Sequence, residues 1–263
     1  MDEVELIDET AIRRLLEPLE FDWLYSQGTE STNVDVLRYH EQHQHQVVAF
    51  SETQSAGRGR RGRQWISPFA RNIYCTVGIA RSMPAESLGL LSIVTGIAIC
   101  RALQGIGIDA VALKWPNDLL SAGKKFGGIL IESRPLADDR YFFAIGFGLN
   151  VFMSADELAD VPQPTTSLDR IVSVPVNRTR LLSAVLSSVI QSVQAFEASK
   201  VDELVTEFQQ FDAFHGKVIE VISGDDIIRG INRGIGATGQ LQLETSAGIE
   251  LYSAAEISLR AAH

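Results

Sequence analysis

Extended apolar segments and helix-like apolar patterns alternate through much of the chain. Residues 86–103 have the spacing of a long helix, between the second and third extended segments. The segments that predict strands are 46–51, 72–80, 110–115, 126–133 and 141–152. Strands and helices are therefore interleaved along the sequence.

Other segments have the pattern of amphipathic helices. In the first 22 residues, the apolar positions of a short helix fall on one side: Ile12, Leu15, Leu16 and Leu19. Ser31 is of a residue type that caps helix starts. Residues 177–199 repeat apolar side chains at helical spacing, and a shorter helix is expected from about Val201 to Phe211.

The pattern changes after His215 and Gly216. Short strand-like segments with Gly and Asp-Asp turns follow, at 217–222, 226–235, 239–245, 248–254 and 256–260. They predict a small β-barrel of about 50 residues, a size that suits an accessory domain.

Composition and charge narrow the classes of protein. The chain has 263 residues, 45% hydrophobic and 21% charged, which suits one large domain or a large domain with a small one. A net charge of -10 disfavours a polyanionic partner unless positive charge gathers on one face. No apolar run reaches the roughly 18 residues of a membrane span, and the acidic N-terminus does not resemble a signal peptide. We therefore expect a cytoplasmic protein without membrane association.

Residues 57–63 read GRGRRGR, which places four arginines among three glycines in a net acidic chain. Arginine offers a planar, permanently charged fork for phosphate or carboxylate, and glycine lets the backbone come close to a ligand. We interpret this segment as an anion clamp. Its anion could be a nucleic-acid backbone or a small phosphorylated ligand.

Three polar or glycine-containing motifs stand at predicted strands. KWPNDLL puts Lys114 and Asn117 beside a Trp-Pro that stiffens the backbone. KFGGIL begins at Lys125 and carries two glycines, and GFGLN at 146–150 places glycines in an apolar strand. Both glycine motifs indicate backbone that a flat ligand can approach. The dinucleotide fingerprint is absent, since it needs a third glycine and a following helix.

The remaining reactive residue types indicate no site. His40, His43 and His45 have spacings that could hold a metal, but a solvated helix end is the better interpretation. Cys75 and Cys100 lie in apolar runs and are expected to be buried.

Five segments occur in one order: STN (31–33), TQSAGRGRRGRQWISP (53–68), KWPNDL (114–119), KFGGILIE (125–132) and GFGLN (146–150). From about residue 10 to residue 260 the chain resembles bacterial biotin protein ligases, the biotin–[acetyl-CoA-carboxylase] ligases. The resemblance implies an α/β (α+β) fold. Residues 1–213 would form a class II synthetase-like catalytic domain, with a mixed central sheet flanked by helices, and residues 214–263 a small SH3-like β-barrel.

The resemblance also implies a two-step reaction. Biotin is activated by ATP with Mg²⁺ to biotinyl-5'-AMP, and the biotinyl group passes to a lysine of the biotin carboxyl carrier protein of acetyl-CoA carboxylase. The anion of the clamp would then be the phosphate of ATP and of the adenylate.

Site residues follow from the same resemblance, position by position. Those matched to biotin are Ser31, Thr32, Asn33, Gln54, Arg58, Gly59, Arg60, Lys125, Gly128, Gly146 and Gly148. Those matched to ATP are Arg58, Arg60, Arg63, Trp65, Lys114, Asn117 and Asn150. Arg60, Lys114 and Lys125 are expected to act at the reacting centre, and no residue is expected to bind a metal. Glu256 and Arg260 match residues at the interface between the two domains.

The chain departs from some family members at two places. Only 30 residues precede STN, too few for a helix-turn-helix domain, so we expect no DNA-binding repressor function. We expect a monomer or a homodimer. Ala254-Ala255 stands where a glycine pair is common in relatives, which implies a different local turn.

Two alternatives remain open from the residues. A lipoate ligase shares the catalytic fold and an adenylate intermediate, although GRGRRG with KWPND favours biotin. A nucleic-acid-binding module could use RGRRGR as a basic patch. The acidic total and the lack of aromatic residues between the arginines disfavour that second alternative.

Overall fold

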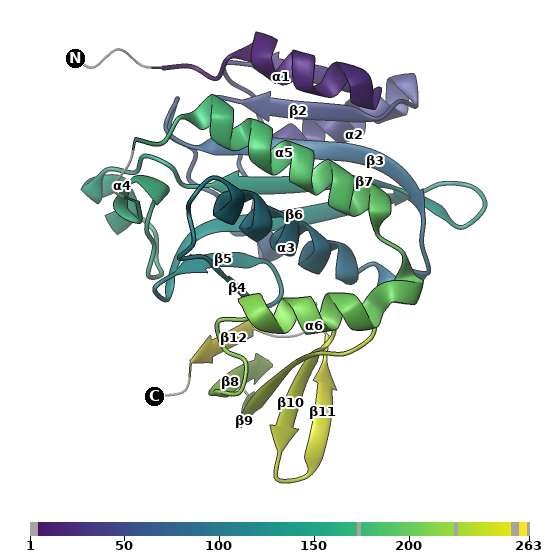
Figure 1. Ribbon diagram of the computed structural model, residues 1–263, viewed down its shortest axis with the longest axis vertical. Coiled ribbons are helices and arrows are strands. Elements are labelled where there is room, and N and C mark those ends of the chain that lie inside the picture. Colours follow the sequence, from purple (N-terminus) through teal and green to yellow (C-terminus); the bar gives the residue numbers. More distant parts are fainter. Residues whose placement is uncertain (1–4, 173–174, 224–225, 254–257, 262–263) are drawn as a thin grey trace.

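The computed structural model describes residues 5–172, 175–223, 226–253 and 258–261. Its larger sheet has seven strands in the order β1-β2-β3-β7-β6-β5-β4 (Figure 1). The strands are β1 (Asp22–Ser26), β2 (Val47–Ser51), β3 (Ile73–Ser82), β4 (Ala112–Lys114), β5 (Asp118–Ser121), β6 (Lys124–Pro135) and β7 (Arg140–Leu149). β1 and β2 are parallel because a helix crosses between them, and the other neighbours are antiparallel. The expected mixed central sheet is confirmed.

Helices cover both faces of this sheet (Figure 1). On one face lies α2 (Thr32–His43), and on the other lie α1 (Glu9–Leu16), α3 (Leu90–Gly105) and α5 (Arg178–Ala195). Successive side chains along β2 point to opposite faces of the sheet and so enter two different cores. Val48 and Phe50 belong to the core beneath α3 and α5, whereas Val47 and Ala49 pack beneath α2. These apolar strands are therefore buried on two sides.

Helix α3 is apolar nearly all around. Together with the preceding turn, residues 85–105 are long and apolar enough to cross a membrane by length and composition. However, 67% of the most apolar window is buried inside the structure, where α3 packs against α5 and the sheet. Such burial explains an all-round apolar helix as a core element.

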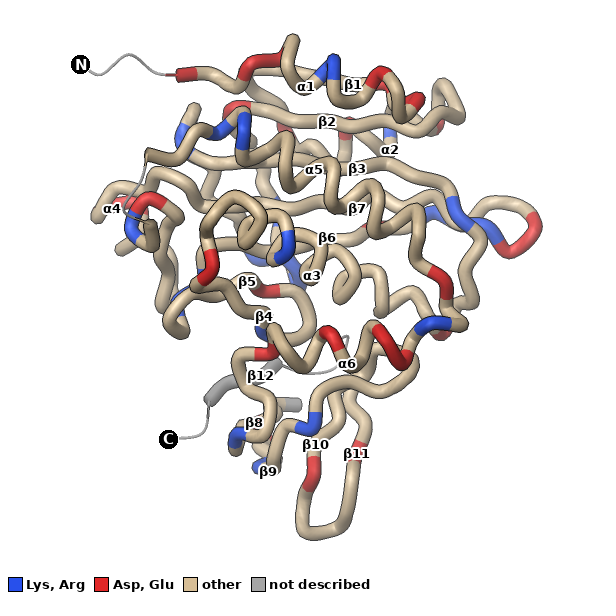
Figure 2. Tube along the Cα trace, viewed as in Figure 1, with Lys and Arg blue, Asp and Glu red and all other residues tan. Residues whose placement is uncertain are grey.

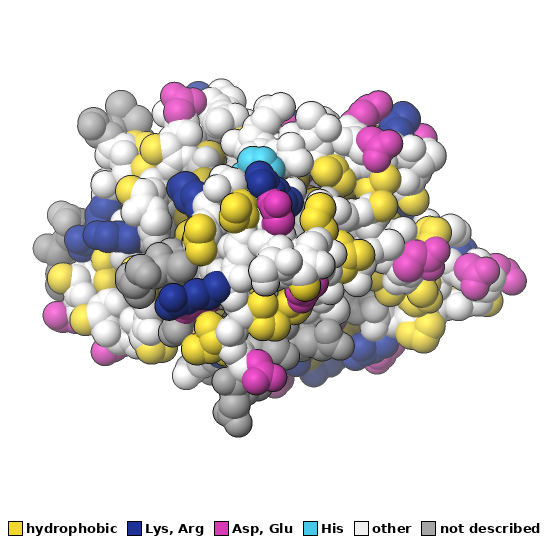
Figure 3. Space-filling view, turned by 90° about the horizontal axis from the view of Figure 1, so that it is seen from below, with side chains coloured by type: hydrophobic (Ala, Val, Ile, Leu, Met, Phe, Trp, Pro, Cys, Tyr) yellow, Lys and Arg dark blue, Asp and Glu magenta, His cyan; other side chains and the backbone are white. Residues whose placement is uncertain are grey.

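The tail forms a second, antiparallel sheet with the order β11-β10-β9-β8-β12 (Figure 1). Its strands are β8 (Val218–Ser223), β9 (Asp226–Ile235), β10 (Leu241–Thr245), β11 (Gly248–Tyr252) and β12 (Ser258–Ala261). It follows α6 (Val201–Phe211) and meets the larger domain where the Trp115 Nε1–H donates to the carbonyl oxygen of Gly239 over 2.9 Å. Viewed from below, the molecule shows hydrophobic side chains scattered between charged ones rather than one apolar patch (Figure 3).

Most predicted elements are confirmed, with differences at their ends. The predicted helix at 86–103 begins as a short 3₁₀ turn, and α3 itself starts at Leu90. β1 and β5 were not predicted, because both are short and mix polar with apolar residues. Ser31 is the N-cap residue of α2, but its side chain makes no capping hydrogen bond. Glu256 and Ala254-Ala255 lie outside the described residues.

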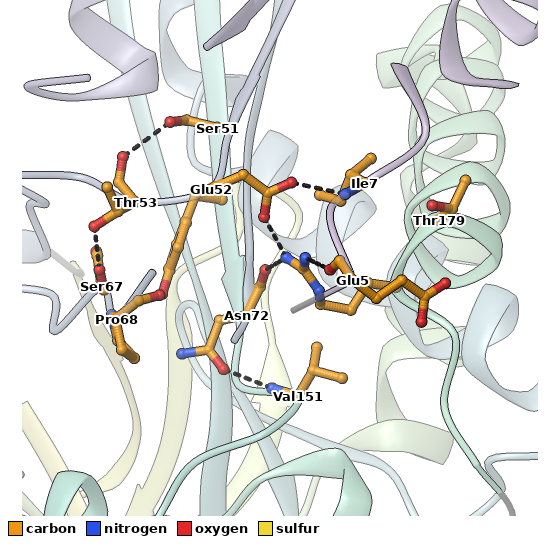
Figure 4. A network of polar contacts seen from close by, with 12 residues as sticks. Glu5, Ile7, Ser51, Glu52, Thr53, Ser67, Pro68, Asn72, Val151 and Thr179 are labelled. Atoms are coloured by element: carbon orange, nitrogen blue, oxygen red, sulfur yellow. Dashed lines mark hydrogen bonds and ion pairs between the residues drawn. The ribbon is translucent and has the colours of Figure 1, made fainter. Parts of the chain in front are cut away.

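A buried ion-pair network joins four distant parts of the chain. Glu52 follows β2 with its side chain fully buried, and Arg178 begins α5 with 4% of its side chain exposed. The Arg178 Nη1–H donates to Oε2 of Glu52 over 2.6 Å and to the carbonyl oxygen of Asn72 over 3.1 Å. The Ile7 N–H donates to Oε1 of Glu52 over 2.7 Å, and Arg178 also donates to the carbonyl of Glu5. The N-terminal segment is thereby tied to β2, β3 and α5 (Figure 4).

The same region closes the base of the arginine-rich loop. The Thr53 hydroxyl donates to the carbonyl oxygen of Ser67 over 2.5 Å, and the Tyr74 hydroxyl donates to that of Pro68 over 3.0 Å. Figure 4 shows Thr53, Ser67 and Pro68 beside Glu52. The two ends of the loop that contains the clamp are thus held together next to the ion pair.

We predict that Arg178→Met destabilises the fold by about 3–5 kcal/mol, because it leaves the Glu52 carboxylate buried without its cation. Urea unfolding measures this change. Arg180→Met is the matched control, since Arg180 is exposed two residues further along α5. The double variant Glu52→Gln with Arg178→Met should recover part of the loss. Equal stability of Arg178→Met and the control would contradict the prediction.

Candidate active site

A cavity of about 960 Å³ lies beside the ends of β5, β6 and β7 and the start of α2. All the residues expected from the sequence to contact biotin or ATP line it. From α2 and the arginine-rich loop come Ser31, Thr32, Asn33, Gln54, Arg58, Gly59, Arg60, Arg63 and Trp65. From the strands and their ends come Lys114, Asn117, Lys125, Gly128, Gly146, Gly148 and Asn150. Segments far apart in sequence therefore meet at one cavity.

The clamp, residues 57–63, folds with Gln64 and Trp65 into a tight hairpin. The Gly59 N–H donates to the carbonyl oxygen of Arg63 over 2.7 Å, and the Trp65 N–H donates to that of Gly57 over 2.8 Å. At Gly57 a Cβ atom would stand 2.6 Å from a backbone oxygen, and Gly62 has a φ of +71°. Two of the glycines are therefore required by the hairpin itself.

Glycines on β6 and β7 bare the floor of the cavity. A Cβ atom on Gly148 would stand 2.7 Å from the Trp65 ring, and one on Gly146 would stand 2.1 Å from Oδ1 of Asn33. The Trp65 indole and the Asn33 amide can lie on the strands only because side chains are missing there. The indole Nε1 is buried without a hydrogen-bond partner among the described residues. This floor suits flat rings.

A chain of polar contacts runs along one end of the cavity. The Thr32 hydroxyl lies 2.8 Å from that of Thr76, which donates to Oδ1 of Asn33 over 2.7 Å. Gln54 Oε1 accepts from the Thr32 N–H over 3.0 Å and so satisfies the first turn of α2 in place of Ser31. Within the described part of the chain the Ser31 hydroxyl has no hydrogen bond, and Ser31 lines the cavity. This end offers several fixed donors and acceptors.

Positive charge gathers at the cavity although the chain is acidic. Its lining includes six basic residues, Arg58, Arg60, Arg61, Arg63, Lys114 and Lys125, against two acidic ones, Asp118 and Asp160. Elsewhere, acidic residues are spread over α1, α4 (Ala155–Ala159), α6 and the turn between β6 and β7 (Figure 2). The cavity is therefore the place where an anion would bind.

Burial makes two of these positive charges, on Lys114 and Arg60, less stable in the absence of an anion. It lowers the pKa of Lys114, an effect that Asp118 opposes and that Lys125 and Arg63 reinforce. Burial also lowers the pKa of the Arg60 guanidinium, which still remains charged. Lys125 Nζ is 2.5 Å from Asp118 Oδ1 and 5.5 Å from the centroid of the Trp65 ring. A bound anion would relieve the repulsion within this cluster.

Several residues at the site were not predicted from the sequence. Glu132 on β6 accepts hydrogen bonds from both Asn33 and Arg58. Residues two apart on a strand lie on the same face of the sheet, so its spacing from Leu130, which lines the cavity, could have indicated that Glu132 lies on that face. Residues 160–163 and Thr165 line the cavity without any motif. Ile222 reaches the cavity from the small sheet, which no local pattern indicates. The histidines and cysteines contribute no metal site among the described residues.

Comparisons with known proteins agree with this arrangement. Residues 23–150 match the Biotin/lipoate A/B protein ligase family, and residues 214–260 match the Biotin protein ligase C terminal domain. The chain is 35% identical over 216 residues to the bifunctional ligase/repressor BirA of Escherichia coli, covering 82% of this chain and 67% of that protein. It is 30% identical over 233 residues to the biotin--[acetyl-CoA-carboxylase] ligase of Paracoccus denitrificans, covering 87% of this chain and 97% of that protein.

The fold is also similar to that of a biotin protein ligase of known structure. The biotin protein ligase of Aquifex aeolicus, solved in complex with biotin and ATP, superimposes with a TM-score of 0.75 at 25% identity, covering 92% of this chain and 99% of that one. The sequence motifs, the cavity and the similarity to these relatives lead to one conclusion. This chain belongs to the biotin protein ligase family.

Proposed function

We propose that this protein activates biotin with ATP to biotinyl-5'-AMP and transfers the biotinyl group to a lysine of the biotin carboxyl carrier protein of acetyl-CoA carboxylase. The observation that carries the proposal is the gathering of six cations over a floor bared by glycines, in a cavity with both apolar and polar walls. Relatives named as biotin ligases, and a similar structure solved with biotin and ATP, support it.

Biotin binds at the end of the cavity that carries the polar chain. Its ureido group has two N–H donors and a carbonyl acceptor, which Ser31, Thr32 and Gln54 can pair. Its bicyclic ring lies against β6 and β7 beside the Trp65 indole, which covers Gly148, and the Asn33 amide, which covers Gly146. Its carboxylate reaches Lys125 and Arg58. ATP binds beside the Trp65 side of the clamp, with Arg63, Lys114, Asn117 and Asn150.

In the first step, a carboxylate oxygen of biotin attacks the α-phosphorus of ATP, and the bond to pyrophosphate breaks. Two anions must approach each other, so Arg60, Lys114 and Lys125 stabilise the charge that develops between them. In the second step, the deprotonated amine of a carrier lysine attacks the acyl carbon and AMP leaves. The clamp excludes water, which would otherwise hydrolyse the mixed anhydride.

Magnesium fits this site as a companion of ATP. No group of three or more His, Cys, Asp or Glu side chains among the described residues could hold a metal ion. Mg²⁺ commonly binds through substrate phosphates with one or two protein oxygens, which Asp118, Asp160 and Asn150 at the cavity can offer. When bound, it supplies charge neutralisation of the phosphates.

The two parts of the chain divide the work. We assign biotin and ATP binding to residues 1–213 and a supporting role to residues 214–263. Ile222 contributes to the cavity wall, and the contact from Trp115 to Gly239 braces the KWPN turn that carries Lys114 and Asn117. Because ATP is a substrate, we place the enzyme in the cytoplasm, as a monomer or homodimer.

Lipoate is the nearest alternative substrate, since the family matched by residues 23–150 includes lipoate ligases. The match of residues 214–260 to a biotin ligase domain favours biotin. Thermal-shift titrations with biotin and with lipoate separate the two: only biotin should raise the melting temperature, and a larger rise with lipoate would reverse the assignment.

Lys125→Ala should slow biotin-dependent exchange of pyrophosphate into ATP. The activation free energy should rise by about 2–4 kcal/mol, which is the usual effect of losing one charge-stabilising donor. Lys124→Ala is the matched control, because Lys124 is the exposed neighbour on β6. Exchange at the parental rate in Lys125→Ala would transfer the role to Lys114 or remove it from both lysines.

The carrier should dock by adding a strand to the second half of β6. Among the described residues, 131–135 pair with β7 on one side, and β5 ends its pairing at Gly128 on the other. Ile129 and Leu130 line the cavity, so this free edge begins at the site.

This docking predicts that a folded carrier domain is biotinylated far faster than a free peptide with the same residues around its lysine. Backbone pairing requires a preformed strand, which the peptide lacks. Rates from streptavidin blots over time, at equal lysine concentration, measure the difference. Equal rates would show that local sequence alone is recognised.

A further inference from the structure

Glu132 links the arginine clamp to the polar end of the cavity. It lies on β6, and its Oε2 accepts from Asn33 Nδ2 over 2.8 Å and from Arg58 Nη2 over 3.1 Å. One carboxylate oxygen therefore serves a residue of α2 and a residue of the clamp. The side chains of Glu132 and Arg58 are 25% and 44% exposed, so the ion pair faces solvent in part.

Of these two partners, Asn33 is the fixed one. It is 4% exposed, and its Oδ1 accepts from the Thr76 hydroxyl over 2.7 Å. The amide lies against Gly146, where no Cβ atom would fit. Its Nδ2 is thereby aimed at Glu132 and at the carbonyl oxygen of Leu130, 3.3 Å away. Glu132 is consequently held in a defined position on the sheet.

Arg58 is the adjustable partner. It stands in the hairpin with Arg60, Arg61 and Arg63, whose charges repel it, and Lys125 lines the same cavity. The contact with Glu132 uses Nη2, and a guanidinium carries five N–H donors, so donors remain for a ligand anion. A carboxylate at this position offsets the repulsion and draws Arg58 toward the sheet.

We propose that Glu132 is a positioning residue, which holds Arg58 over the cavity and couples that arginine to Asn33 at the polar end. This inference rests on the proposed function, because the ligands that it concerns are biotin and biotinyl-5'-AMP. Glu132 acts through Arg58, so its removal weakens binding and retention of the ligand. The rate constant of the chemical step depends on Lys125 and its neighbours and changes little.

Glu132→Gln tests the role, because a glutamine keeps the length and an oxygen for Asn33 but loses the charge that attracts Arg58. We expect the dissociation constant for biotin, measured by calorimetry, and the release rate of biotinyl-5'-AMP each to rise about tenfold, the scale of a partly exposed charge-assisted contact. The kcat of pyrophosphate exchange should stay within about threefold. Glu41→Gln, at an exposed position of α2, is the matched control.

A double-mutant cycle with Arg58→Gln separates positioning from direct contact. If Glu132 acts through Arg58, the double variant should bind biotin no more weakly than Arg58→Gln alone. Additive losses would overturn the proposal, and so would unchanged binding in Glu132→Gln. Tighter binding would show that Glu132 competes with the ligand for Arg58, which also overturns it.

Two further outcomes are distinguishable. A lowered melting temperature in Glu132→Gln would make Glu132 a structural residue and contradict the positioning role. A parent protein that binds no biotin would contradict the proposed function itself, whereas normal binding by the parent and by Glu132→Gln alike would contradict this inference only.

Discussion

The buried ion pair between Glu52 and Arg178 is the constraint on which the site depends. A charge removed from water is stable only with a partner and further hydrogen bonds, and this pair has both. Satisfying it requires the N-terminal segment, the end of β2, the start of β3 and the start of α5 to meet at one point (Figure 4). The loop with the arginines leaves the sheet there, so its base is held by the core.

Two features that face each other define the cavity: the floor formed by β6 and β7, and the arginine-rich hairpin above it. The glycines of β6 and β7 remove side chains from the floor, which lets the Trp65 indole and the Asn33 amide lie directly on the backbone and shape the space beside them. The hairpin brings arginines above the floor, and burial makes the charges of Arg60 and Lys114 costly until an anion arrives. An apolar ring joined to a carboxylate, next to a phosphate, matches this arrangement. That combination is what biotin and ATP present together.

Much of the fold and of the site could be predicted from local patterns in the sequence. The apolar stripe of α5 follows from helical periodicity, and β3 and β7 follow from continuous apolar runs, since both strands are buried on two sides. The chemistry of the site could also be predicted from three motifs, GRGRRGR, KWPND and KFGG. Their arginines and lysines bind anions, and their glycines let a ligand approach the backbone. All the expected site residues line the same cavity, although their individual ligands follow from the family resemblance.

What local pattern could not indicate depends on contacts between distant segments. β1 and β5 are short, and their pairing rests on β2 and β6 rather than on their own sequence. Glu132 reads as an ordinary strand carboxylate until Asn33 and Arg58 are brought to it from 99 and 74 residues away. The wall at 160–163 and Ile222 contribute only through their position in the fold.

The most direct test of the account is the intact mass of a folded biotin carboxyl carrier domain after incubation with this protein, biotin and MgATP. We expect a gain of one biotinyl group, located at the carrier lysine by peptide mapping and absent when ATP or biotin is omitted. An unchanged carrier mass, with a protein that is folded and binds both substrates, would contradict it.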